Sequence, residues 1–184
     1  MIHNQDRSGW FGASDTQQIM GPWTSKTFEA WWLEKLGVPR QRFQTVYTLA
    51  GNYFEHRILD SIGITQWDGQ VKIRRLRLRV NLDGEDDGTV YEVKTHKGEY
   101  RLPRAHWMQC QVEMFATRKS CELVDYRMEA EDYENFFRPI DPARLGRRTV
   151  AYDALWIEEA YLPRLHYLST CLRRKVMPVD QPQI

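Results

Sequence analysis

The sequence predicts a single α/β domain, residues 1–184, in which a small mixed sheet is flanked by helices. The prediction rests first on the order of the periodic segments, which runs helices, hairpin, helix, strand, helix. It rests also on length, because 184 residues suit one hydrophobic core and are too few for two ordinary domains. Hydrophobic residues make up 42% of the chain and charged residues 28%, which excludes a disordered or fibrous protein.

Three helices are predicted before the first strand. Residues 13–20 form the first, with Ser14 as N-cap and Gln17 closing a capping box. Residues 25–36 and 45–62 form the second and third, because their apolar side chains recur at helical spacing.

Strands and helices alternate after residue 70. Residues 74–82 alternate between leucine or valine on one face and arginine on the other, and a glycine-rich turn joins them to a second strand at 89–95. A helix follows at 103–117, and a third strand at 121–128. The last helix, residues 154–175, contains a proline at position 163 that should kink or split it.

Composition also excludes several classes of protein. No stretch approaches the roughly 18 apolar residues of a membrane helix, and residues 1–7 lack the apolar core of a signal peptide. The three cysteines cannot pair completely and are one short of a four-thiolate zinc or iron–sulfur site: Cys110, Cys121 and Cys171. We therefore expect reduced thiols in a cytoplasmic protein, neither secreted nor membrane-bound, with no cysteine-held metal.

The net charge of +1 conceals a strong local segregation of charge. Residues 71–80 contain five bases and no acid, whereas residues 81–92 contain five acids and no base. Carboxylates set among basic surfaces suit a metal-dependent enzyme that acts on a polyanion. A solvated charged hairpin is the alternative interpretation.

The acidic segment contains a candidate metal site. Asp83 ends one strand at a glycine turn, and Glu92 and Lys94 project from the same face of the next strand. If these strands pair, the two carboxylates can approach one divalent ion, and oxygen ligands favour Mg²⁺ or Mn²⁺ over zinc. Lys94 would then position an attacking water and help to deprotonate it. The alternative is an ordinary Glu-x-Lys pair on a surface strand.

Two helical residues extend this candidate site. Glu55 lies at the edge of a buried stripe, where a carboxylate needs a metal or a partner such as His56 or an arginine. Gln111 lies within an apolar stripe, where its amide must bond a water, a phosphate or neighbouring backbone.

Several short motifs occur in a fixed order between Arg7 and Met128: Gly12-Ala13-Ser14-Asp15, Gly51-x-x-x-Glu55, Asn81-Leu82-Asp83-Gly84, Glu92-Val93-Lys94 and Gln109-x-Gln111. Together they resemble the phage lambda-type exonucleases, the YqaJ-like viral recombinase nucleases of the PD-(D/E)XK superfamily. The resemblance implies a restriction-endonuclease-like core at 1–131. It leaves 132–184 as an unassigned, mostly helical extension.

The resemblance also implies an activity and partners. Members of this family degrade one strand of linear double-stranded DNA from its 5′ end, leave a 3′ overhang, often form ring-shaped trimers and work with a single-strand annealing protein. A Mg²⁺-dependent 5′–3′ deoxyribonuclease is therefore expected, homo-oligomeric and in the cytoplasm of the bacterial host if a phage encodes it. The alternatives are a nuclease for single strands, flaps or internal cuts, and a non-catalytic fold that binds DNA ends.

Residue roles follow from the same resemblance. The metal would be bound by three acids and one carbonyl: Asp83, Glu92, Glu55 and the carbonyl of Val93. Lys94 would hold the nucleophilic water, and Gln111 would orient that water or Lys94. Arg7 and Ser14 would bind a phosphate, the 5′-terminal one in this family.

Overall fold

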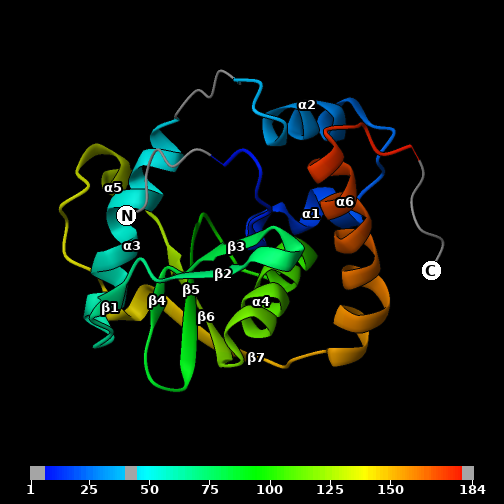
Figure 1. The fold of residues 1–184 in the computed structure, drawn as a ribbon. Coiled ribbons are helices and arrows are strands. Elements are labelled where there is room, and N and C mark those ends of the chain that lie inside the picture. Colours follow the sequence, from blue (N-terminus) through cyan, green and yellow to red (C-terminus); the bar gives the residue numbers. More distant parts are fainter. Residues whose placement is uncertain (1–6, 40–44, 180–184) are drawn as a thin grey trace.

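A computed structural model describes residues 7–39 and 45–179, which form a five-stranded mixed sheet, a separate two-stranded ribbon and surrounding helices (Figure 1). In spatial order the sheet consists of β1 (Gln66–Trp67), β4 (Gly84–Glu85), β5 (Thr89–His96), β6 (Ser120–Arg127) and β7 (Leu145–Val150). The ribbon pairs β2 (Gln70–Ile73) with β3 (Leu78–Asn81). Strands β5 and β6 are parallel, and the other neighbours are antiparallel. The predicted mixed α/β fold is confirmed.

Six α-helices accompany these strands in the described ranges: α1 (Thr16–Met20), α2 (Lys26–Lys35), α3 (Val46–Ser61), α4 (Arg104–Thr117), α5 (Ala130–Glu134) and α6 (Leu162–Arg174). The short turns are η1 (Ala13–Asp15), η2 (Arg74–Leu76) and η3 (Pro142–Arg144), and η4 (Trp156–Tyr161) is a π-helical segment. Helix α4 is the crossover that the parallel pair β5–β6 requires. In the part of the chain that the structure describes, no helix combines the length and the apolar character needed to span a bilayer.

The sheet separates two hydrophobic layers. Val90 points into the larger layer, which contains α4, the ribbon and helices α1, α2 and α6. Tyr91 points to the opposite face, which α3 covers (Figure 1). Because side chains alternate along a strand, Glu92 and Lys94 point to the same face as Val90, toward α4.

Helices α2 and α3 begin as the sequence predicts. Ser25 caps α2 by accepting a hydrogen bond from the backbone N–H of Phe28 at 3.1 Å, and Thr45 caps α3 in the same way. The first helix begins differently, because Asp15 accepts the N–H of Gly12 at 2.7 Å. The predicted N-cap at Ser14 is therefore wrong, and this residue lies inside the η1 turn.

The predicted pairing of strand 74–82 with strand 89–95 is also wrong. Residues 74–76 form the η2 turn, and Arg77 adopts a left-handed conformation with φ of 52°, so β3 begins only at Leu78. Strand β3 pairs with β2, and the two-residue β4 pairs with β5 in its place. The alternating pattern extends through the turn because Leu76 is buried like the leucines of the strand.

The described C-terminal region, residues 132–179, packs into the main core and adds a strand to the sheet besides its helices. Strand β7 pairs with β6 along its whole length, and α6 packs in the larger hydrophobic layer. The helix predicted at 154–175 is continuous from residue 154 to 174, with the π-helical segment η4 directly before α6. A π turn accommodates Pro163, which lacks an N–H donor, so the helix is neither split nor ended there.

Candidate active site

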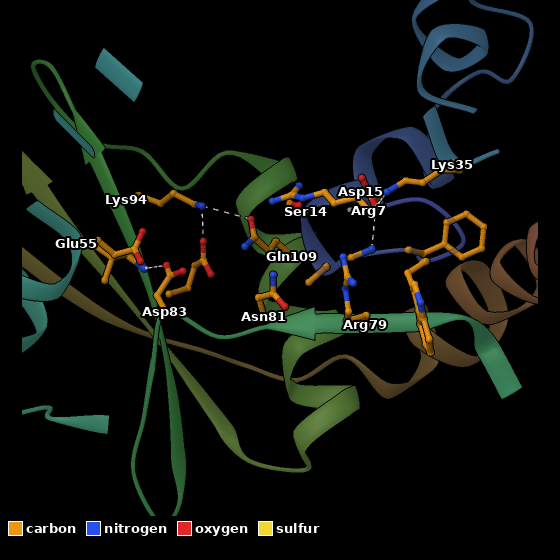
Figure 2. Close-up of a pocket in the computed structure, with 16 residues that line it drawn as sticks. Arg7, Ser14, Asp15, Lys35, Glu55, Arg79, Asn81, Asp83, Lys94 and Gln109 are labelled. Atoms are coloured by element: carbon orange, nitrogen blue, oxygen red, sulfur yellow. Dashed lines mark hydrogen bonds and ion pairs between the residues drawn. The ribbon is translucent and has the colours of Figure 1, made fainter. Parts of the chain in front are cut away.

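One pocket gathers most of the predicted site residues (Figure 2). It encloses about 200 Å³ and receives side chains from the η1 turn, α3, β3, β5 and α4. Figure 2 shows two ends: Glu55, Asp83 and Lys94 lie at one, and Arg7 and Arg79 lie at the other. The pocket therefore joins an acidic cluster to a basic wall.

The register of the sheet places Asp83 opposite Glu92. Gly84 pairs with Tyr91 in the antiparallel ladder, and one further step along it brings Asp83 and Glu92 face to face. Asp83 Oδ2 accepts a hydrogen bond from the backbone N–H of Val93 at 2.9 Å, which holds the carboxylate against β5. Both carboxylates line the same pocket, as does Val93.

Two carboxyl groups of the pocket, Asp83 and Glu55, have a raised pKa. Burial raises the pKa of Asp83 well above its usual value, and the charges of Glu92 and Glu55 add to the effect. Burial also raises the pKa of Glu55 to about 7, with Glu92 and Asp68 contributing. A cluster in which the ionisation of Asp83 and Glu55 is disfavoured forms a site that a bound cation would stabilise.

Lys94 is held as an ammonium ion within this cluster. Its Nζ forms an ion pair with Glu92 Oε1 and donates a hydrogen bond to Gln109 Oε1 at 3.3 Å. Burial lowers the pKa of Lys94, but the charges of Glu92 and Asp83 outweigh burial and the pKa is raised overall. Lys94 is therefore suited to orient a water or an anion.

The donor set fits a divalent cation that prefers oxygen ligands. Glu92 is 1% exposed, and among the described residues its Oε2 has no hydrogen-bond partner. A buried carboxylate oxygen without a partner is costly, and a cation supplies the missing interaction. Asp83 and Glu55 add carboxylate oxygens to the same pocket, and Val93 also lines it, so the residues present fit Mg²⁺ or Mn²⁺.

A second group of potential ligands adjoins Glu55. Ligand atoms of Glu55, His56 and Asp68 lie within 4.8 Å of one another, and His56 Nε2 is 3.3 Å from Asp68 Oδ2. The partner that the sequence suggested for Glu55, His56, is thus paired with another acid. The acidic end of the pocket therefore continues from α3 to the turn before β2.

Gln111 does not reach the pocket, which corrects its predicted role. It is fully buried, its Nε2 donates to the carbonyl of Ala151 at 2.8 Å, and its Oε1 accepts the N–H of Asp153 at 2.7 Å. Gln109 lies in the pocket instead, between Lys94 and Glu113. Side chains two positions apart on a helix point in directions about 200° apart, so only one glutamine of Gln109-x-Gln111 can face the site. The sequence contains both and does not say which.

The basic wall contains both residues predicted to bind phosphate. Arg7 and Ser14 line it, together with Arg79, which the sequence placed in a row with Arg75 and Arg77. Lys35 also borders the pocket, but its Nζ is 2.5 Å from Asp15 Oδ2 and both side chains are largely buried. The charge of Lys35 is therefore neutralised within the protein, and the guanidinium groups are the cations suited to a ligand.

Two solved structures share this fold. An alkaline exonuclease from Laribacter hongkongensis is 18% identical, with a TM-score of 0.61 over 92% of this chain and 94% of that chain. A phage-related exonuclease from Haemophilus somnus 129PT is 12% identical, with a TM-score of 0.61 over 90% and 94%. The chain has the phage-type exonuclease fold. The resemblance seen in the motifs is thereby confirmed at the level of the fold, and the exonuclease fold extends well beyond residue 131.

Sequence comparisons add nothing to this result. No family model matches the chain, and no curated protein matches it. The exonuclease fold is therefore recognised through coordinates and through motifs of a few residues each.

Proposed function

We propose that this chain is a metal-dependent DNA exonuclease that hydrolyses linear double-stranded DNA from 5′ ends and leaves 3′ overhangs for phage-type recombination. The observation that carries the proposal is the single pocket in which Asp83, Glu92 and Lys94 face Arg7 and Ser14. Carboxylates that fit a divalent cation and cationic groups that fit a phosphate line the same cavity. The exonuclease fold of the chain supports the same conclusion.

In this proposal Asp83, Glu92, Glu55 and the carbonyl of Val93 hold the cation, Mg²⁺ or in its place Mn²⁺. When bound, such an ion polarises a phosphate and activates water for attack. Asp83 is oriented for this task by the N–H of Val93. The high pKa values of Asp83 and Glu55 mean that cation binding displaces protons from the cluster.

Lys94 and Gln109 act on the water and the scissile phosphate. The Lys94 ammonium stabilises negative charge at the phosphate and orients the water by donating a hydrogen bond. Gln109 positions Lys94, because its Oε1 accepts from Lys94 Nζ while its Nε2 donates to Glu113 Oε1 at 3.0 Å. The helix α4 thereby fixes the ammonium relative to β5.

The basic wall binds the 5′-terminal phosphate in this proposal. Arg7 and Arg79 offer planar guanidinium donors, which bind phosphate oxygens in pairs, and Ser14 adds a hydroxyl. A phosphate held at this end of the pocket places the next phosphodiester bond toward the acidic end. The arrangement selects a strand terminus rather than an internal segment.

The resemblance extends the proposal to assembly. We infer a homo-oligomer, a trimeric ring as in the family, that works with a single-strand annealing protein in the cytoplasm of a bacterial host. Light scattering of the purified chain should give the mass of three subunits. A monomer would contradict the ring but would not affect the chemistry of the pocket.

The test of the activity uses three DNA substrates. Linear duplexes with and without a 5′-phosphate and a closed circle of the same sequence are incubated with Mg²⁺ or with EDTA. The proposal expects loss of linear duplex only in Mg²⁺, faster with the 5′-phosphate, and no change in the circle. Cutting of circles would indicate a different nuclease, and binding without hydrolysis would indicate a non-catalytic fold.

We expect the thermal stability in EDTA to fall as the pH rises from about 5 to about 8. The pKa of Glu55 is about 7 in the folded chain, above its ordinary value of 4.5, so the folded state binds the proton more tightly. This stabilisation is complete below pH 4.5 and is lost as the pH passes 7. The rise in melting temperature that Mg²⁺ causes should be roughly 5 °C larger at high pH than at low pH.

Glu55→Gln is the control for this pH dependence. The variant cannot ionise at position 55, so its melting temperature in EDTA should change less with pH than that of the wild type. Differential scanning fluorimetry across the pH range measures both chains. A wild-type melting temperature that rises over the same range would contradict the electrostatic description of the pocket.

The two glutamines of α4 should behave differently on substitution. Gln111→Ala leaves the Ala151 carbonyl and the Asp153 N–H without partners and should lower the free energy of unfolding by about 1–3 kcal/mol. Gln109→Ala should change stability less but slow hydrolysis, because Lys94 loses its acceptor. Urea unfolding and DNA hydrolysis measure the two effects. A catalytic loss confined to Gln111→Ala would restore the role predicted from the sequence.

A further inference from the structure

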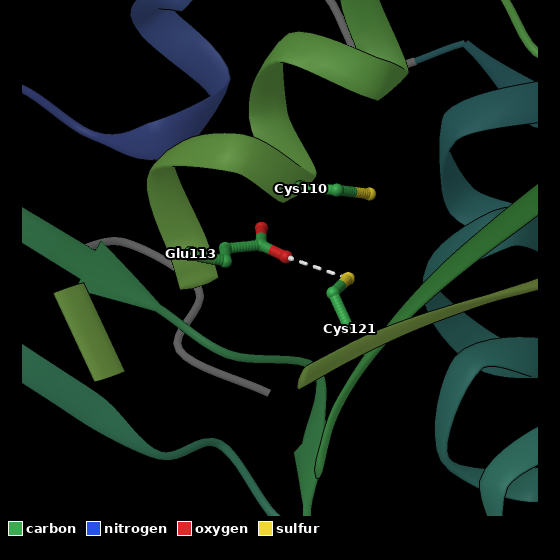
Figure 3. Close-up of side chains that lie close together, drawn as sticks. All are labelled: Cys110, Glu113 and Cys121. Carbon is green, nitrogen blue, oxygen red and sulfur yellow. Dashed lines mark hydrogen bonds between the residues drawn. The ribbon is translucent and has the colours of Figure 1, made fainter. Parts of the chain in front are cut away.

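Two of the three cysteines lie together with a carboxylate (Figure 3). Cys110 and Glu113 are one turn apart on α4, and Cys121 lies at the start of β6. All three side chains are buried, and their ligand atoms lie within 4.8 Å of one another. Cys121 Sγ is 4.0 Å from Glu113 Oε2. The third cysteine, Cys171, is on α6 and does not belong to this group.

This cluster adjoins the acidic end of the pocket through Glu92. Burial raises the pKa of Glu113 well above its usual value, and the neighbouring Glu92 adds to the effect. Glu92 is itself buried, and its Oε2 has no hydrogen-bond partner within the described ranges. Two buried carboxylates therefore lie side by side, and the ammonium of Lys94 pairs with only one of them.

We propose that Cys110, Glu113 and Cys121 form a second cation site that takes a soft divalent ion such as Zn²⁺ or Cd²⁺. Thiolate sulfur selects these ions over Mg²⁺, which prefers oxygen ligands alone. A tetrahedral zinc ion with bonds of about 2.0–2.3 Å separates its ligand atoms by roughly 3.5 Å. The 4.0 Å between Cys121 Sγ and Glu113 Oε2 is close to that separation.

The number of cysteines does not exclude this site. A four-thiolate site needs four cysteines, whereas a site with two thiolates and one carboxylate needs only two. On binding, the two thiols lose their protons to solvent and each sulfur forms one bond to the ion, with no change in oxidation state.

Occupation of this site should inhibit the proposed nuclease, and this consequence rests on the proposed function. Glu113 neighbours Glu92, so a soft ion bound to Glu113 disturbs a ligand of the ion bound within the pocket. Disturbing the support of a metal ligand costs roughly 10–100-fold in metal affinity or activity. The site would thus make the enzyme sensitive to zinc while it works in magnesium.

The binding test needs no DNA. The reduced full-length chain is titrated with Cd²⁺ in a buffer containing a phosphine reductant, and the ultraviolet charge-transfer absorbance of cadmium–thiolate bonds is followed. We expect saturation at one ion per chain, loss of the absorbance in Cys110→Ser and Cys121→Ser, and no change in the matched control Cys171→Ser. Absence of the absorbance in the wild type, or its persistence in Cys121→Ser, would overturn the proposal.

X-ray absorption of the zinc-loaded wild type tests the site without any variant. Two sulfur ligands with at least one oxygen ligand support the proposal, and a shell without sulfur overturns it. Zn²⁺ at one equivalent should then lower DNA hydrolysis in Mg²⁺ by roughly tenfold in the wild type and not in Cys121→Ser. Cadmium–thiolate absorbance in a chain that hydrolyses no DNA would refute the proposed function and leave the cation site intact.

Discussion

Asp83→Asn is expected to lower the rate of DNA hydrolysis by about 10³-fold or more while the chain still folds. The substitution removes a negative charge opposite Glu92 and keeps an oxygen that can accept the N–H of Val93. Because Asp83 in its charged form is penalised by burial and by two neighbouring acids, the neutral amide should not destabilise the protein in EDTA. Single-turnover hydrolysis of a 5′-phosphorylated duplex and thermal unfolding measure the two effects.

Asp87→Asn is the matched control for this substitution. Asp87 lies on the same hairpin but is exposed in the turn between β4 and β5. Loss of its charge should leave hydrolysis unchanged. Equal rates for wild type and Asp83→Asn would remove Asp83 from the site, and equal losses in both variants would indicate a general effect of charge on DNA binding.

Lys94→Ala is expected to produce the second large loss, about 10²–10³-fold in the rate of hydrolysis at saturating DNA. The variant removes the ammonium that contacts Glu92 and Gln109 at the acidic end of the pocket. It also leaves Glu92 buried without its ion-pair partner, which should lower stability in EDTA by about 3 kcal/mol. Added Mg²⁺ should recover part of this stability but not the rate.

Lys97→Ala is the control for the ammonium group. Lys97 follows β5 by one residue, is exposed and donates to the Tyr47 hydroxyl at 3.3 Å, outside the pocket. Its removal should leave the rate at saturating DNA unchanged. A loss in Lys94→Ala that is matched by Lys97→Ala would mean that both lysines only attract DNA, and that Lys94 has no role in the chemistry.

The elements of this chain that form from local signals could be predicted from the sequence. Ser25 and Thr45 are the N-caps of helices α2 and α3, because the hydroxyl of each accepts the backbone N–H three residues later. The common pocket for Asp83 and Glu92 could also be anticipated, because a tight turn between them brings the two residues face to face. Hydrophobic periodicity and turn-forming residues act over a few positions, so they can be recognised directly in the sequence.

The pairing of strands that are distant in the sequence could not be predicted from such local signals. The alternation of residues 74–82 was correct in burial, yet the partner strand was wrong, because burial alone does not say which strand lies alongside. Strand β7 could not be placed in the sheet from its own residues, since its exposure pattern depends on β6 beside it. In the same way, the exonuclease fold needed coordinates to be recognised beyond residue 131.

By itself the sequence determined the class of fold and the start of the main helices. It also identified acids, a lysine and an arginine that line one pocket. Only the tertiary structure decided that Gln109 and not Gln111 reaches the pocket, and that Cys110 and Cys121 share a cluster with Glu113. The physical reason is one of range. Helix formation and turn geometry depend on neighbours in the chain, whereas the orientation of a helix on a sheet depends on the packing of its whole apolar surface.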